Sequence, residues 1–176
     1  NPNKFDREHA EEWPGGRYNH YVFDMNRDWA WQTQAETKQR MAIYNQWMPH
    51  VHSDIHEQGY DSPYFFPPAA EPQHEFIEAY QKDFHKLLGK NIAEKFDEKN
   101  WLYNTSERFD LFYPSYGDTY PMYNGAVGMT IEQGGIRAGR EVTMENGVNL
   151  TIKERLTHHK TAVLAVIETS ASQMEP

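Results

Sequence analysis

Three things are scarce or missing in this chain: cysteine, basic residues and long apolar runs. Because there is no cysteine, disulfides and thiolate metal sites are excluded, and a bound metal would have to use His, Asp or Glu. The 17 Lys and Arg residues are outnumbered by 26 Asp and Glu residues, and the formal net charge of −9 argues against nucleic acid or an anionic membrane as a partner. No apolar stretch approaches the roughly 20 residues that a membrane-spanning helix needs, so we expect no membrane span.

Aromatic residues, in contrast, are abundant: they make up 14% of the 176 residues and predict a core built largely on rings. The length suits one domain with a real core and is short for two. The chain does not begin with Met, and residues 1–16 are polar and show no signal-peptide pattern. We therefore expect residues 1–176 to be a single partial domain cut from a longer protein.

Residues 51–59 (VHSDIHEQG) carry the most information about a site. The alternation predicts a central strand with His52, Asp54 and His56 on one face. The strand stops at a glycine and continues into an aromatic, proline-punctuated loop. A histidine and two carboxylates at the end of a strand suit a pocket that holds a metal or a general acid–base pair. The pattern is not that of a zincin, because no His lies three positions after Glu57.

Before this strand, residues 18–25 (YNHYVFDM) predict a buried strand or extended segment that leads to Asn26 and Arg27. Thr33 and Glu36 have the spacing of a capping box, which predicts the start of a helix that ends by residue 49.

After the strand, Pro72 is well placed to begin a helix, and Gly89 is expected to break it, with a shorter helix over residues 92–97. A strand-like segment at 101–103 and an apolar strand at 131–135 follow. The alternation of strands and helices predicts an α/β sheet with helices packed against it.

Two turn and cap signals organise the end of the chain. Asn146–Gly147 is the best hairpin signal in the sequence, and Thr151 with Glu154 forms a second capping box that opens a last helix. Leu156, Val163 and residues 166–167 are expected to face inward, whereas His158 and His159 are expected to be solvated or to cap the helix.

Three pieces with different chemistry stand at the ends of predicted elements. Arg27, beside the amide of Asn26, could grip a substrate carboxylate through two parallel hydrogen bonds. His56 could bind zinc as a neutral imidazole, oriented by Asp54 if that side chain reaches the ring. Glu132, after an apolar strand, is a candidate general base for an activated water.

Together these pieces resemble the zinc carboxypeptidase family, the carboxypeptidase A-like metallopeptidases, in a bacterial branch. The resemblance covers nearly the whole chain in order. It is carried by residues 26–29 (NRDW), 54–59 (DIHEQG), 64–68 (YFFPP) and 125–135 (GAVGMTIEQGG), and in the bacterial branch also by residues 1–3 (NPN) and 13–17 (WPGGR). It implies that the chain is the carboxyl-terminal part of a mixed-sheet zinc-carboxypeptidase-like fold.

The resemblance also implies roles for single residues. Asn26 and Arg27 match the pair that binds the carboxylate of the substrate's last residue. His56 matches the third zinc ligand, and Glu132 matches the base and proton shuttle. Tyr113 is the best match for the mobile tyrosine that closes over substrate, with Tyr116 as second choice. Asp118 and Thr119 fall near the floor of the pocket for the substrate side chain.

One departure from the family is severe. The family's first two zinc ligands, a His-x-x-Glu, and a second carboxylate-binding Arg lie upstream of the Asn-Pro segment with which this chain begins. His9 and Glu12 have that spacing but follow the segment, so we expect them to be solvated loop charges. Two zinc ligands are therefore expected outside this chain, which by itself should bind zinc poorly.

The function implied for the whole protein is zinc-dependent release of carboxyl-terminal residues from peptides. The alternatives are a related zinc amidase or deacylase on the same fold, and a non-catalytic domain that kept the carboxylate cleft and lost the metal site. The resemblance further implies an exported protein whose partner is a peptide with a free carboxylate. We also expect self-association through strand edges that the missing part would cover.

Overall fold

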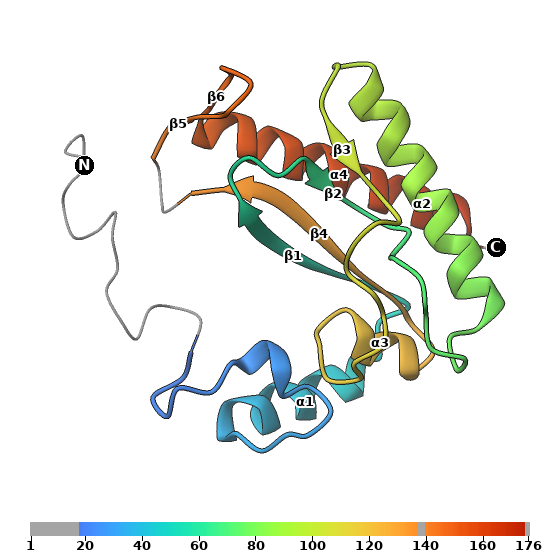
Figure 1. Ribbon diagram of the computed structural model, residues 1–176. Helices are drawn as coiled ribbons and strands as arrows, with labels where there is room; N and C mark the ends of the chain where they lie inside the picture. The colour runs from blue at the N-terminus through green and yellow to red at the C-terminus, as the bar shows by residue number, and fades with distance from the viewer. Residues whose placement is uncertain (1–17, 137–139, 175–176) are drawn as a thin grey trace.

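The computed structural model describes residues 18–136 and 140–174. His9 and Glu12 lie outside the described residues. The elements, in chain order, are the 3-10 helix η2 (Met25–Arg27), α1 (Ala35–Trp47), β1 (Val51–Gly59), β2 (Tyr64–Phe65), α2 (Ala79–Asp97), β3 (Tyr103–Asn104), α3 (Thr119–Tyr123), β4 (Val127–Gly135), β5 (Val142–Thr143), β6 (Asn149–Leu150) and α4 (Ile152–Ser172). Figure 1 shows β1 and β4 side by side at the centre of the structure.

The main sheet has four strands in the order β1-β4-β2-β3 and is mixed. β1 and β4 run parallel over nine residue pairs, β2 is antiparallel to β4, and β3 is parallel to β2. The predicted α/β class, with helices packed on a sheet, is therefore confirmed. The prediction that residues 51–59 form a central strand is wrong in one respect, because β1 lies at an edge of this sheet and β4 occupies the interior.

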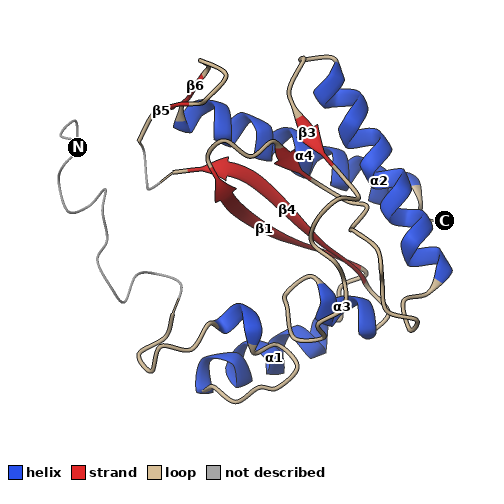
Figure 2. Ribbon diagram, in the orientation of Figure 1, coloured by secondary structure: helices blue, strands red, loops and turns tan. Residues whose placement is uncertain are grey.

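The two faces of β4 meet different surroundings. Met129 and Ile131 point into the main hydrophobic cluster, which also contains Leu88 and Phe96 of α2 and Ala162 of α4. Figure 2 shows α2 and α4 on one side of the sheet, with α1 and α3 on the other. Since successive side chains of a strand point to opposite faces, the residues between these apolar positions face away from α2 and α4.

Two predicted helix boundaries are wrong for local reasons. α1 begins after Gln34 rather than at a capping box, because Thr33 donates its hydroxyl to Asp28 Oδ1 at 2.7 Å and is held outside the helix. α2 begins at residue 79, after Glu78 and Gln81 form their own capping box.

α2 also runs through Gly89 without a break. A glycine costs a helix interior only about 1 kcal/mol. Here it is needed, because a Cβ at this position would collide with the carbonyl oxygen of Pro67. The loop before α2 therefore packs on the helix through this glycine.

The prediction of a buried strand or extended segment over residues 18–25 is wrong. Tyr18 and Asp24 form an isolated bridge around a turn, and the apolar side chains of Tyr21 and Phe23 are exposed. Asn19 holds this turn, since its side-chain oxygen accepts from the backbone N–H groups of Tyr21 and Phe23.

The end of the chain follows its local signals more closely. β5 and β6 form the antiparallel hairpin around residues 146–147, and Thr151 and Glu154 make the reciprocal capping bonds at the start of α4. Val166 is buried as expected, but Leu156 and Ile167 are exposed. Within the described ranges no helix combines the length and the apolarity that crossing a membrane would require.

Candidate functional site

The parallel pairing of β1 and β4 brings His56 and Glu132 together. They are register partners, so their side chains leave neighbouring strands on the same face. This face is the one opposite α2 and α4, because Ile131 on the other face lies in the core. Glu132 is 8% exposed, and Phe65 of β2 is its register partner on the far side. The sheet therefore presents an imidazole and a buried glutamate side by side.

Asp54 reaches the ring of His56, the contact that the sequence could not establish. The distance between Asp54 Oδ2 and His56 Nε2 is 2.9 Å. Asn26 also donates to Asp54 Oδ2 from its Nδ2 at 2.9 Å. Burial raises the pKa of Asp54, but the hydrogen bonds from His56 and Asn26 outweigh it and leave the pKa below its ordinary value. His56 Nε2 also lies 3.1 Å from Asn26 Nδ2, so one ring nitrogen of His56 faces both Asp54 and Asn26.

Asn26 is held from its other side as well. Its side-chain oxygen accepts from Trp29 Nε1 at 2.9 Å and from the backbone N–H of Gly117 at 3.0 Å, which fixes the orientation of the amide. A Cβ added to Gly117 would lie 2.5 Å from Asp54 Oδ2 and 2.7 Å from Asn26 Oδ1. The absence of a side chain at residue 117 is therefore what allows this loop to approach the strand.

Arg27 and Glu132 line one pocket of about 350 Å³, here named the Glu132 pocket. The guanidinium of Arg27 lies 4.2 Å from the ring centroid of Tyr116 and 3.8 Å from Asp24 Oδ2. Its side chain is 44% exposed, so the charge can be presented to a ligand. Six residues were proposed from the sequence to form the site, and five of them line this pocket: Asn26, Arg27, His56, Tyr116 and Glu132. The lining also includes Glu57, Arg108, Asp110, Asp118 and Thr130.

Tyr113, the first choice for the mobile tyrosine, lies outside this lining in a neighbouring pocket. Its hydroxyl accepts from Trp31 Nε1 at 2.7 Å and donates to the backbone carbonyl of Arg27 at 3.4 Å. Its ring packs against that of Tyr116, with 4.7 Å between centroids. In this structure Tyr116 is the tyrosine at the Glu132 pocket.

Asp118 and Thr130 also line the Glu132 pocket. Asp118 is 4% exposed and accepts hydrogen bonds from the hydroxyls of Thr130 at 2.8 Å and Thr119 at 2.9 Å. Burial raises the pKa of Asp118, and the nearby charge of Asp54 adds to the effect despite these two donors. Thr130 could have been found from sequence, because it stands two residues before Glu132 and a strand repeats its face every two residues.

Glu57 and Arg155 form an ion pair that sequence reasoning missed. Glu57 Oε1 lies 2.6 Å from Arg155 Nη1, and the Arg155 side chain is 2% exposed. The pair ties the end of β1 to the first turn of α4, and Arg155 also donates to the carbonyl of Ile136 at 3.0 Å. A basic residue in a helix gives no local sign of such a partner, because the two residues are 98 positions apart.

A complete metal site is not formed by the residues that the structure describes. Among them no group of three or more His, Asp or Glu side chains is arranged to hold a metal ion. Catalytic zinc sites use three protein ligands. His56, fixed by a carboxylate through its second ring nitrogen, has the setting typical of one such ligand. The described part of the chain therefore offers at most a share of the ligand set.

No protein-family model matches the chain, and no curated protein matches its sequence. Its fold is similar to the crystal structure of a metallo-carboxypeptidase from Burkholderia cenocepacia, with a TM-score of 0.68 and 12% sequence identity. The similarity covers 90% of this chain and 41% of the other, so the chain spans less than half of that protein's length. At this identity the likeness concerns the fold alone: an α/β unit that resembles part of a metallo-carboxypeptidase.

Proposed function

We propose that this chain is the carboxyl-terminal part of the catalytic domain of a zinc-dependent carboxypeptidase. The observation that carries the proposal is that Arg27, His56 and Glu132 line one pocket although they are far apart in sequence. The similarity of the fold to part of a metallo-carboxypeptidase supports it. The substrate would be a peptide with a free carboxylate, and the protein would be exported.

In this proposal each residue acts through its own chemistry. Arg27, with Asn26 beside it, binds the terminal carboxylate and so positions the last peptide bond. Glu132 accepts the proton of the attacking water and returns it to the leaving amine. His56 would be one of the ligands that hold the zinc ion. Zinc in such sites supplies Lewis acidity.

The test uses the full-length protein and two matched peptides, one with a free carboxyl terminus and one amidated. We expect cleavage of the free peptide only, loss of cleavage with a chelator, and recovery with zinc. Equal cleavage of both peptides would indicate an amidase or deacylase instead. Binding of the free peptide without cleavage would indicate a carboxylate-binding domain.

Arg27→Ala should raise KM for the free peptide. The expected loss in kcat/KM corresponds to about 2–4 kcal/mol, or roughly 30- to 900-fold, because a charged contact is lost. Arg108→Gln is the matched control, since it removes the same charge from the same pocket and should leave the preference for a free carboxylate intact. If Arg27→Ala leaves KM unchanged, the carboxylate is not held there.

A further inference from the structure

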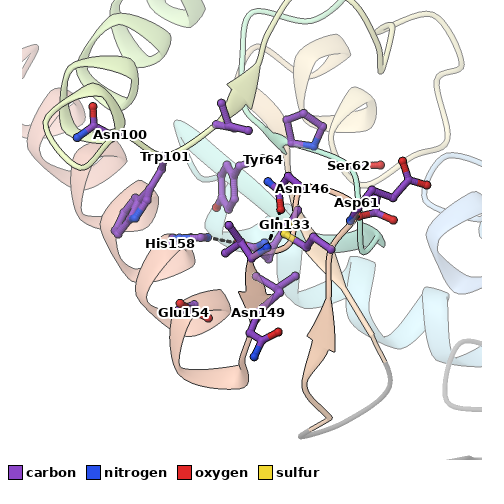
Figure 3. Close-up of a pocket in the computed structure, with 16 residues that line it drawn as sticks. Asp61, Ser62, Tyr64, Asn100, Trp101, Gln133, Asn146, Asn149, Glu154 and His158 are labelled. Atoms are coloured by element: carbon purple, nitrogen blue, oxygen red, sulfur yellow. Dashed lines mark hydrogen bonds between the residues drawn. The ribbon is translucent and has the colours of Figure 1, made fainter.

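A second pocket lies on the opposite face of β4, and it is independent of the proposed carboxypeptidase activity. Its volume is about 500 Å³, and it is bounded by the start of β2, the α2–β3 connection, the β5–β6 hairpin and the first turns of α4 (Figure 3). Gln133, which follows Glu132 in β4, lines this pocket and is 3% exposed. We name it the hairpin pocket.

The floor of the hairpin pocket is fixed by hydrogen bonds and ring contacts. His158 Nδ1 donates to Gln133 Oε1 at 2.7 Å, and the indole of Trp101 packs on the imidazole with 4.2 Å between centroids. The adjacent His159 is hydrogen-bonded to the hydroxyl of Tyr64 at 2.9 Å. The expectation that these two histidines are solvated or cap the helix is therefore wrong, since both dock α4 onto the sheet. A floor held in this way presents the Trp101 ring in a defined position.

The hairpin closes the pocket from the other side. The backbone N–H of Glu145 donates to Asp61 Oδ1 at 2.7 Å, which joins the hairpin to the turn before β2. Gly147 has a φ of +82°, and the tight turn that this allows is closed by the bond from its N–H to the Met144 carbonyl at 2.9 Å. In Figure 3 Trp101 and Asp61 stand at opposite sides of the pocket.

The lining combines an apolar wall with negative charge. Trp101, Leu102 and Val148 contribute apolar surface, whereas Asp61, Glu145 and Glu154 contribute carboxylates. Of the described residues that line the pocket, none is Lys or Arg. Burial lowers the pKa of His158, so its imidazole is neutral at neutral pH and adds no positive charge. The pocket therefore repels anions and suits a ligand that is apolar along its stem and cationic at its head.

We propose that the hairpin pocket binds a primary ammonium group on a short aliphatic stem, with the stem against Trp101 and Leu102 and the ammonium between Asp61 and Glu145. The indole offers the stem an apolar contact on the side of the pocket opposite Asp61. Two sources share this chemistry: the lysine side chain of a peptide, and a free diamine.

Calorimetric titration of the full-length protein tests the proposal with three probes: Nα-acetyl-lysine amide, cadaverine, and the neutral isostere Nα-acetyl-norleucine amide. Saturable binding of either cation, with no detectable binding of the norleucine amide, is the expected result. If the lysine amide binds more tightly, the ligand is the lysine side chain of a peptide. If cadaverine binds more tightly, the ligand is a free diamine. No saturable binding of either cation, or equal binding of the norleucine amide, overturns the proposal.

Variants locate the binding. Asp61→Asn with Glu145→Gln retains side-chain shape and the acceptor for the Glu145 N–H, and should weaken cation binding by at least about tenfold. The control, Glu75→Gln with Glu98→Gln, changes the net charge by the same amount at exposed positions. It should leave cation binding unchanged. Glu145→Gln alone, at an exposed side chain, gives an intermediate loss if the double variant fails to fold. Unchanged affinity in the pocket variants, or equal weakening in the control, overturns the proposal.

Discussion

Glu132 and Gln133 are neighbours in β4, yet they belong to pockets of opposite character. The Glu132 pocket is walled by polar and charged side chains, including two arginines, and is built from β1, β4, η2 and the loop before α3. The hairpin pocket has an apolar wall, with carboxylates but no arginine or lysine among the described residues that line it. A strand changes face at every residue, so a single step along β4 separates two kinds of chemistry. The difference shows that the sheet, rather than distance along the chain, separates the two pockets.

The largest expected effect tests the Glu132 side of this comparison. In the full-length protein Glu132→Gln should reduce turnover by about 10²–10⁴-fold, because the amide cannot take a proton from water. Zinc content should stay unchanged, since Glu132 is proposed as a base and not as a ligand. The measurements are kcat on a peptide with a free carboxylate and zinc per protein molecule. Unchanged turnover would show that Glu132 is not the base. Glu75→Gln, at an exposed position, serves as the control.

The stability of the protein should depend on pH through a buried histidine on the side of the sheet that α2 and α4 cover. His85 of α2 is 1% exposed and hydrogen-bonds the Gly128 carbonyl of β4 through Nε2 at 2.8 Å. Burial lowers its pKa from 6.5 to about 4. Between these values the unfolded chain binds a proton that the folded chain does not. Stability should therefore be full above about pH 6.5 and fall as the pH drops toward 4, by about 3 kcal/mol for this group.

Urea unfolding across this pH range measures the effect of His85. In His85→Gln, which keeps a donor for the Gly128 carbonyl, the free energy of unfolding should depend less steeply on pH. An identical pH dependence in the variant and the wild type would show that His85 is not the group responsible. A lower stability at all pH values, with an unchanged slope, would lead to the same conclusion.

The smallest expected effect concerns the loop that approaches the Glu132 pocket. Gly117→Ala should destabilise the protein by about 1–3 kcal/mol, because the new methyl group must displace Asp54 or Asn26. Gly59→Ala is the matched control at the end of β1, where the nearest atom to a new Cβ is Ser62 Oγ at 3.7 Å. The free energies of unfolding of the two variants give the comparison. Equal losses would show that the space at Gly117 is not critical.

Strong local signals predicted their elements well. The alternation in residues 51–59 matches β1, the Asn146–Gly147 pair lies in the hairpin turn, and Thr151 caps α4. These succeed because the determining contacts are made within a few residues. Gly89 misleads for the opposite reason, because the Pro67 carbonyl, distant in sequence, packs on it. Thr33 misleads because a competing local partner, Asp28, binds its hydroxyl outside the helix.

The candidate site was predictable only in part. Asn26, Arg27, His56 and Glu132 could be picked out by residue type and by family resemblance, and the structure places them in one pocket. Their roles remain predictions. Asp54 could be named as a partner of His56 only conditionally, because its reach depends on the strand's geometry. The partnership of Glu57 and Arg155 gave no local signal, since the two residues are 98 positions apart in sequence.

Residue spacing alone determined the period of β1, the hairpin and the cap of α4, and the composition excluded thiolate metal sites. The tertiary structure decided that β4 rather than β1 is interior, that His56 and Glu132 are register partners, and that the two α4 histidines dock on the sheet. The physical reason is that strand pairing and docking join residues tens of positions apart, so the sequence around one partner does not identify the other.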